Sequence, residues 1–122
     1  YYFWAPKWTG HKIPESRGKF HFWNSLLWLN VTFFPMHFLG LAGMPRRYAD
    51  YPAQFADFNA LVSVGAFLFG LTQVYFLFFV VLPNLRGGEK AAAHVWEGAE
   101  GLEWTVASPA PWHTFATPPV VK

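Results

Sequence analysis

Two long apolar runs organise the chain. Residues 20–44 and residues 58–82 each hold 25 positions without Asp, Glu, Lys or Arg. A helix rises 1.5 Å per residue, so a run of this length crosses the ~30 Å hydrocarbon core of a bilayer. We expect helices because a lone pair of strands leaves backbone groups unsatisfied in lipid. The pattern predicts an all-α membrane protein with a two-helix transmembrane hairpin.

Polar segments that contain Gly and Pro precede and follow the two runs. Four basic residues precede the first run, two lie between the runs and three follow the second. The positive-inside rule therefore predicts that both ends lie on the cytoplasmic or matrix side. The "SPAP" and "TPPVV" stretches predict an extended, surface-lying C-terminal tail. The predicted order is the end of a preceding helix with an inner-side loop (1–19), a transmembrane helix (20–44), an outer-side loop (45–57), a transmembrane helix (58–82) and an inner-side tail (83–122).

Composition narrows the class of protein and of chemistry. Charged residues make up 13% of the chain, against about a quarter in soluble domains. Aromatic residues reach 21%, as expected near membrane interfaces. The absence of cysteine excludes disulfides and thiolate metal sites. The basic residues are scattered, which argues against nucleic-acid binding. With no Ser-His-Asp set, phosphate loop or zinc spacing, we expect no self-sufficient active site.

Two adjacent arginines, Arg46 and Arg47, follow the first apolar run directly after Pro45. Side chains of neighbouring residues point in different directions, so the pair can bind two different anions. The guanidinium group is well suited to carboxylates and phosphates. The simpler interpretation on the residues alone is that both arginines reach lipid phosphates. Two features argue against this interpretation: this side of the membrane has fewer basic residues, and Pro45 fixes the backbone just before the pair.

The first run contains a histidine and a proline at membrane depth. His37 follows Asn30 by seven residues and shares its helical face. Histidine can bind haem or copper, but no second histidine stands three or four residues away. We therefore favour a neutral His37 that hydrogen-bonds to a neighbouring helix. Pro35 predicts a kink, flanked by Phe33 and Phe34, which either pack or form a wall against a flat macrocycle.

Other polar and small residues suggest packing more than chemistry. Ala66 and Gly70 form a small-xxx-small pair suited to close helix contact. Asp50 and Asp57 flank the middle loop, where they are candidates for capping the second helix or binding a cation.

A family resemblance accounts for several of these features together. The stretch "FFPMHFLGLAGMPRRYADYP" resembles the eleventh-to-twelfth helix region of subunit I in the cytochrome c oxidase branch of the haem–copper oxidases. The stretches "GKFHFW" and "LEWTVASPAPWHTF" resemble the start of the eleventh helix and the C-terminal tail. The resemblance covers essentially the whole chain and implies the last two helices of a twelve-helix bundle. The "RGGEKAAAHVWEGAEG" stretch departs from any pattern of the family.

The resemblance implies a function for the complex and a limited role for this chain. The complex would transfer electrons from cytochrome c to oxygen and pump protons, in the bacterial plasma membrane or the mitochondrial inner membrane. Its partners would be the remainder of subunit I, other oxidase subunits, cytochrome c and membrane lipid. The chain would not be catalytic alone, since the histidine ligands of haem iron and of copper B lie in earlier helices. It would be either the product of a split gene or a part of a longer chain.

The resemblance also implies cofactor contacts at named positions. His37 matches a position that is not a metal ligand. The implied contacts are haem a and haem a3 propionates at Arg46 and Arg47, the haem a ring at Phe33 and Phe34, and an outer-side Na⁺ or Ca²⁺ at Asp50 and the backbone of Ala49.

A different class of protein is the alternative: an independent two-span scaffold or assembly protein of a respiratory complex, whose arginines bind lipid headgroups.

Overall fold

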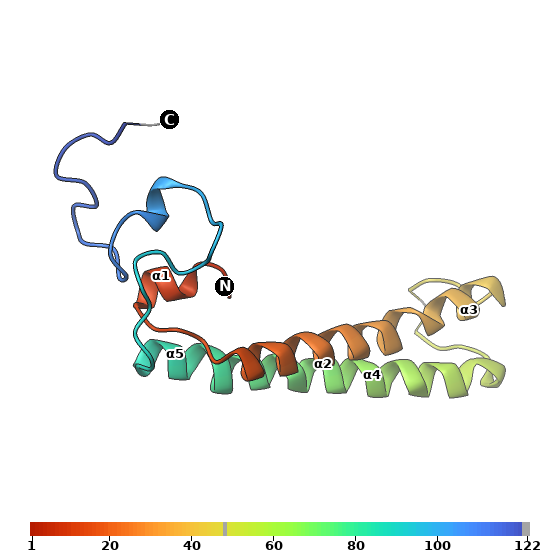
Figure 1. The fold of residues 1–122 in the computed structure, drawn as a ribbon. Coiled ribbons are helices and arrows are strands. Elements are labelled where there is room, and N and C mark those ends of the chain that lie inside the picture. The colour runs from red at the N-terminus through yellow and green to blue at the C-terminus, as the bar shows by residue number, and fades with distance from the viewer. Residues whose placement is uncertain (48, 121–122) are drawn as a thin grey trace. The chain divides into compact units, whose positions relative to one another are not determined.

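The computed structural model describes residues 1–47 and 49–120. Tyr48 of the arginine motif and Lys122, counted above among the basic residues of the tail, lie outside these described residues. Within them all regular elements are helical, and a single bridge joins His11 to Lys90. The elements in Figure 1 are α1 (Ala5–Thr9), α2 (Glu15–Phe33), α3 (Pro35–Leu41), the 3₁₀ turn η1 (Ala53–Phe55), α4 (Ala56–Tyr75), the π-helix η2 (Phe76–Val81), α5 (Leu82–Arg86) and the 3₁₀ turn η3 (Leu102–Trp104).

The chain divides into two compact units. The terminal unit consists of Tyr1–Gly18 and Leu77–Lys122, and the helix-pair unit is Lys19–Phe76. Among the described residues, one helix is long and apolar enough to cross a membrane: Ala53–Arg86, with mean hydropathy 2.1 and 17% of its apolar window buried. This helix contains the second predicted run. The first run forms most of α2 together with α3, and its crossing of the membrane stays a prediction.

In the helix-pair unit, α2 and α4 lie side by side and antiparallel (Figure 1). Close contacts pair early residues of α2 with late residues of the second helix. The Gln73 amide donates to Ser25 Oγ at 3.3 Å, and the His21 ring stacks on Phe76 at 4.6 Å between centroids. Six buried or half-buried positions of the first apolar run are alternately four and three residues apart, as in a coiled-coil seam: His21, Ser25, Trp28, Thr32, Pro35 and Leu39.

At Gly65 the backbones of α2 and α4 come close together. A Cβ added there would lie 2.9 Å from the backbone nitrogen of Thr32. A Cβ at Gly70 would meet nothing within 4 Å, and Ala66 is exposed. The prediction that Ala66 and Gly70 form the close helix contact is therefore wrong within this pair. Both residues lie off the seam, on which Val62, Gly65 and Thr72 are buried.

Two prolines interrupt regular helical hydrogen bonding. Since Pro35 has no N–H for the carbonyl of Val31, α2 ends at Phe33 and α3 begins at Pro35. The interruption predicted at Pro35 is confirmed. Pro83 likewise cannot donate to the carbonyl of Phe79, which accepts instead from Nη1 of Arg17 at 3.1 Å. The helix continues through Pro83 in α5 to Arg86, after a π-helical segment.

The terminal unit is held together by its tail. The Ala91 N–H donates to the Gly10 carbonyl at 2.8 Å, and the Trp96 indole donates to the Phe3 carbonyl at 2.8 Å. Trp104 in η3 is only 2% exposed and meets the Phe3 ring edge-on at 4.9 Å. The tail is largely irregular and mostly exposed, as predicted, and Trp104 is its buried residue.

Candidate functional site

The loop after α3 carries the arginine pair in an unusual backbone conformation. Arg47 has φ +58°, in the left-handed region that residues with a side chain rarely adopt. This conformation costs roughly 1–2 kcal/mol. Strain of this kind is common at functional sites. Because α3 ends at Leu41, the loop and not the helix sets the directions of the Arg46 and Arg47 side chains.

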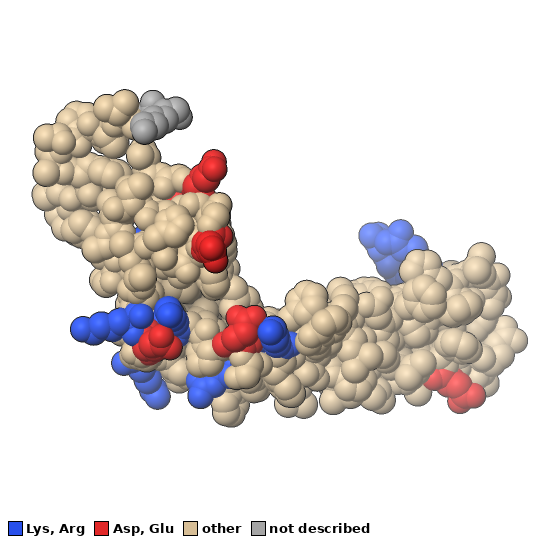
Figure 2. All heavy atoms as spheres, viewed as in Figure 1, with Lys and Arg blue, Asp and Glu red and all other residues tan. Residues whose placement is uncertain are grey.

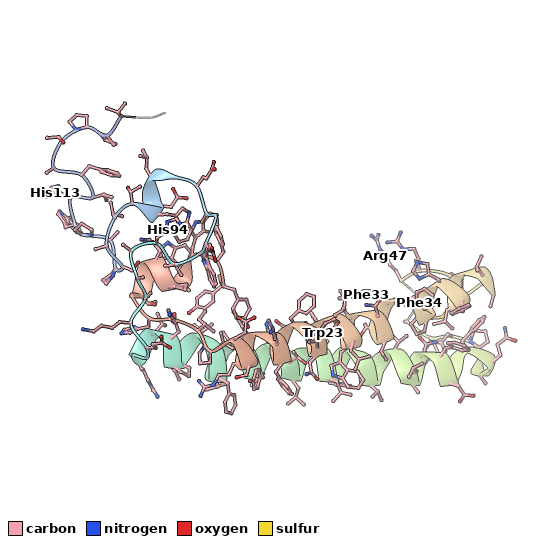
Figure 3. The ribbon with its side chains drawn as sticks, viewed as in Figure 1. Trp23, Phe33, Phe34, Arg47, His94 and His113 are labelled. Carbon is pink, nitrogen blue, oxygen red and sulfur yellow. The ribbon has the colours of Figure 1, made fainter. Side chains whose placement is uncertain are left out.

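Both arginines are exposed, and neither has a hydrogen bond or an ion pair with another described residue. In Figure 3 the Arg47 side chain projects outward above the junction of α2 and α3, on the side away from α4. On the face shown in Figure 2, this end of the helix pair carries a basic patch with no acidic atoms beside it. Two guanidinium groups are therefore available to anions from outside this unit.

Phe33 and Phe34 flank the break between α2 and α3 with largely exposed rings. Their exposed fractions are 54% and 58%, and Figure 3 labels both near Arg47. Phe34 also borders an open apolar hollow of about 460 Å³, together with Leu27, Asn30, Val31, Pro35 and Leu61. The Phe34 ring meets Phe38 edge-on at 5.6 Å between centroids. The rings thus offer apolar surface that this chain does not cover.

His37 is exposed and forms a local hydrogen bond. Its Nδ1 lies 3.1 Å from the Phe34 carbonyl, one turn back along the chain. A hydrogen bond from His37 to a neighbouring helix outside this unit stays a prediction. Asn30 also bonds locally, donating from Nδ2 to the Leu26 carbonyl at 2.7 Å. Both polar groups lie on the outward side of the first apolar run, away from the seam.

The predicted cation position has one local feature. Asp50 and Ala49 are exposed, and Asp50 Oδ1 accepts the backbone N–H of Tyr51 at 2.8 Å. Residues 1–47 and 49–120 contain no group of three or more His, Cys, Asp or Glu placed to hold a metal ion. A cation at Asp50 would need backbone carbonyls, water or ligands from elsewhere, and the site stays a prediction.

Lys7 is a buried cation that sequence reasoning missed. It is 3% exposed, and its Nζ donates to the carbonyls of Ala93 at 2.6 Å and Val106 at 2.7 Å. The ammonium also lies 5.6 Å from the centroid of the Trp104 ring. Burial lowers the pKa of Lys7, and the nearby Glu103 carboxylate partly opposes this shift. Lys7 thus fastens two parts of the tail to α1.

A second buried polar group, Asn84, joins the end of the long helix to the N-terminal segment. Its Oδ1 accepts from the Tyr1 and Thr9 hydroxyls, each at 3.1 Å, and its Nδ2 donates to the His11 carbonyl at 2.8 Å. Burial raises the pKa of Tyr1. His11 Nδ1 is buried without a hydrogen-bond partner among the described residues. The three hydrogen bonds of the Asn84 amide explain how this side chain, which is only 3% exposed, is accommodated.

Comparison with known proteins assigns the family. The model of the family described as "Cytochrome C and Quinol oxidase polypeptide I" matches residues 1–68. Cytochrome c oxidase subunit 1 of Cereibacter sphaeroides is 49% identical over 93% of the chain, and that of Yarrowia lipolytica is 39% identical over 99%. The chain covers 20% and 26% of the lengths of these relatives. It therefore belongs to the cytochrome c and quinol oxidase polypeptide I family, and the matches are consistent with a C-terminal portion of subunit I.

Proposed function

We propose that this chain is the C-terminal part of the catalytic subunit of a cytochrome c oxidase. The complex would transfer electrons from cytochrome c to oxygen and pump protons. Family membership and the names of its relatives support this proposal. The remainder of subunit I would supply the ligands of the haem irons and of copper B. The role of this chain is to complete the helix bundle and to bind haem substituents on the outer side.

The surface of the helix-pair unit supports a place inside a membrane complex. Outside the seam, α4 exposes a line of large apolar side chains that includes Leu61, Val64, Phe67, Leu71 and Val74. On the face shown in Figure 2, the side of this unit is almost free of charge. We place this line against lipid. The outward side of α2, with Asn30 and His37, would face the rest of the subunit, where polar groups find partners. Both chain ends would lie on the inner side.

The observation that carries the site assignment is the exposed Arg46–Arg47 pair, which has no partner among the described residues and holds Arg47 in the left-handed conformation. A haem propionate is a carboxylate, and the forked N–H donors of arginine match it. Hydrogen bonds to charged groups contribute about 1.5–3 kcal/mol each. Haem, when bound, stores and passes electrons. The two arginines hold the propionates of haem a and haem a3 in place and keep positive charge beside them.

A contact with the haem a ring and a cation site belong to the same proposal. The exposed rings of Phe33 and Phe34 would cover part of the haem a macrocycle, since flat apolar surfaces pack well on aromatic rings. The carboxylate of Asp50 and the carbonyl of Ala49 would contribute to a site for Na⁺ or Ca²⁺, cations that prefer oxygen ligands.

The test is purification of the chain from its native membrane in mild detergent. A reduced-minus-oxidised optical spectrum and mass spectrometry of the co-purifying proteins are then recorded. An a-type haem signal together with the remaining helices of subunit I is expected. A chain that purifies without haem and without oxidase subunits would overturn the proposal.

The alternative is an independent two-span scaffold or assembly protein, whose arginines bind lipid phosphates. The specific observation in its favour is the position of both exposed arginines at the end of the helix pair, where long basic side chains reach headgroups. The same purification separates the two functions, because a scaffold would retain lipid but no haem.

A further inference from the structure

The backbone of Met44 fixes the direction in which the chain leaves α3. Its N–H donates to the carbonyl of Leu39 at 3.0 Å, and the N–H of Gly43 donates to the carbonyl of Gly40 at 3.1 Å. Together with the left-handed φ of +93° at Gly43, these two bonds form a Schellman motif. Leu39 is buried on the seam. The backbone at Met44 is therefore held by the packed side of α3.

The side chain of Met44 meets α4 at Asn59. The Asn59 Nδ2 donates to Met44 Sδ at 3.5 Å, and the same group donates to the carbonyl of Phe55 at 2.8 Å. A side-chain amide has two N–H donors, so both bonds form at once. Asn59 is half-buried and stands three residues before the buried Val62, on the same side of α4. A side chain held by its own helix thus contacts the loop.

Little of the chain separates this contact from the arginine pair. Residues 41–47 are all described, and within them Met44 alone is not exposed. Pro45 follows it directly, with a φ that its ring restricts to about −65°. Arg46 and Arg47 come next and have no partner among the described residues. The two guanidinium groups therefore take their position from a backbone that is anchored at Met44.

We propose that Asn59 is a positioning residue for the arginine pair and acts through Met44. The proposal rests on the proposed function, in which the two arginines bind haem propionates. Hydrogen bonds weaken steeply when the donor is misaligned. A loop anchored at Met44 keeps the guanidinium groups aligned with the propionates, whereas a loop without this contact would do so only part of the time.

The test uses the intact complex and two measurements, potentiometric titration of the haems and amide hydrogen exchange of residues 43–47. Asn59→Leu keeps a side chain of similar size but removes the donor. We expect the equilibrium constant for reduction of at least one haem to fall about threefold. This is about 28 mV, since a tenfold change corresponds to 59 mV for one electron. Exchange should accelerate at least threefold, because the loop opens more often.

Asn24→Leu is the matched control. Its Nδ2 donates to the carbonyl of Phe20 at 2.9 Å, so the same substitution removes the same kind of local bond within a helix. Asn24 precedes Met44 by twenty residues and lies in the first half of α2. The control should change neither the haem potentials nor the exchange of residues 43–47.

Met44→Leu tests whether Asn59 acts through the sulfur. It removes the acceptor and keeps an apolar side chain, and it should cause the same two changes. The Asn59→Leu/Met44→Leu double variant should be affected no more than either single variant, because both break one contact. Additive effects would overturn the proposal. If Asn59→Leu does not assemble, the more conservative Met44→Leu decides, and its unchanged exchange would overturn the proposal.

Unchanged exchange in Asn59→Leu would overturn the positioning role, and so would equal changes in Asn24→Leu. Faster exchange without a change in potential would also overturn it, if the Arg46→Gln/Arg47→Gln variant does lower the potentials. Unchanged potentials in that arginine variant would contradict the proposed function instead. The exchange data would still show whether Asn59 anchors the loop, so the two failures are distinguishable.

Discussion

Lys7 in the terminal unit and the arginine pair in the helix-pair unit are cations in opposite surroundings. Lys7 is buried, and two backbone carbonyls of the tail accept its hydrogen bonds. Arg46 and Arg47 are exposed and have no partner among the described residues. A cation whose partners lie within the chain stabilises the fold. A strained, unpartnered pair indicates anions supplied from outside.

The apolar residues of the two units differ in the same way. In the terminal unit Trp104 of the tail is buried and contacts Phe3, and Ala5 and Val80 are buried as well. In the helix-pair unit only a narrow seam is packed, and the outward sides of α2 and α4 stay uncovered. The terminal unit thus resembles a small folded core, whereas the helix-pair unit has the surface of a component in a larger assembly.

The largest loss of stability is expected from a substitution that disrupts the packing between α2 and α4. Gly65→Leu places a side chain where even a Cβ lies 2.9 Å from the backbone of Thr32. Overpacking of this kind costs about 3 kcal/mol, roughly a hundredfold in the packing equilibrium. The yield of haem-containing complex and its thermal midpoint would both fall. Gly70→Leu is the control, since nothing lies within 4 Å of a Cβ there. Equal losses in the two variants would show that the seam is misplaced.

A smaller effect is expected when the tail loses its buried cation. Lys7→Met keeps the length of the side chain but removes both hydrogen bonds to the carbonyls of Ala93 and Val106. We expect a loss of about 2 kcal/mol in tail docking, after partial compensation by the lower desolvation cost. Amide hydrogen exchange of residues 89–106 should accelerate roughly 30-fold. Lys90→Met alters an exposed lysine and should leave the exchange unchanged. Unaltered protection in Lys7→Met would contradict the role of Lys7.

The smallest expected effect is a dependence of tail docking on pH. Burial holds the pKa of Lys7 below its ordinary value of 10.5 when the tail is docked. At a pH between the docked and the ordinary pKa, Lys7 therefore binds more protons in the undocked state than in the docked state. Docking therefore becomes more stable as pH rises through this window, and below it Lys7 contributes no pH dependence. Exchange of residues 89–106, corrected for the intrinsic rate, should slow as pH rises towards 10.5. This slope should be absent in Lys7→Met, and a slope of opposite sign would contradict the assignment.

The amino-acid sequence predicts local features of the fold better than long-range ones. The two apolar runs and the break at Pro35 follow from hydropathy and from the missing N–H of proline. The close contact at Gly65 does not follow, because spacing alone identifies small residues without saying which side of the helix meets its neighbour. The bonds of Lys7 join residues 86 and 99 positions apart, and no local pattern reports such pairing.

The candidate site shows the same division. The sequence alone predicts that the adjacent arginines after Pro45 bind anions, a role that stays a proposal. The left-handed backbone at Arg47 could not be predicted, since nothing in the residue type favours it. The local bond of His37 to the Phe34 carbonyl was also missed, because the hypothesis considered only a neighbouring helix as its partner.

The central claim is that Arg46 and Arg47 bind haem propionates, and a potentiometric titration of the haems in the assembled complex tests it most directly. Arg46→Gln and Arg47→Gln each remove a positive charge beside a propionate and disfavour the reduced, more negative haem. Each should lower the midpoint potential of at least one haem by on the order of 60 mV, the equivalent of about 1.4 kcal/mol for one electron. Arg86→Gln should change neither haem. Unchanged potentials in the Arg46→Gln/Arg47→Gln double variant would contradict the claim.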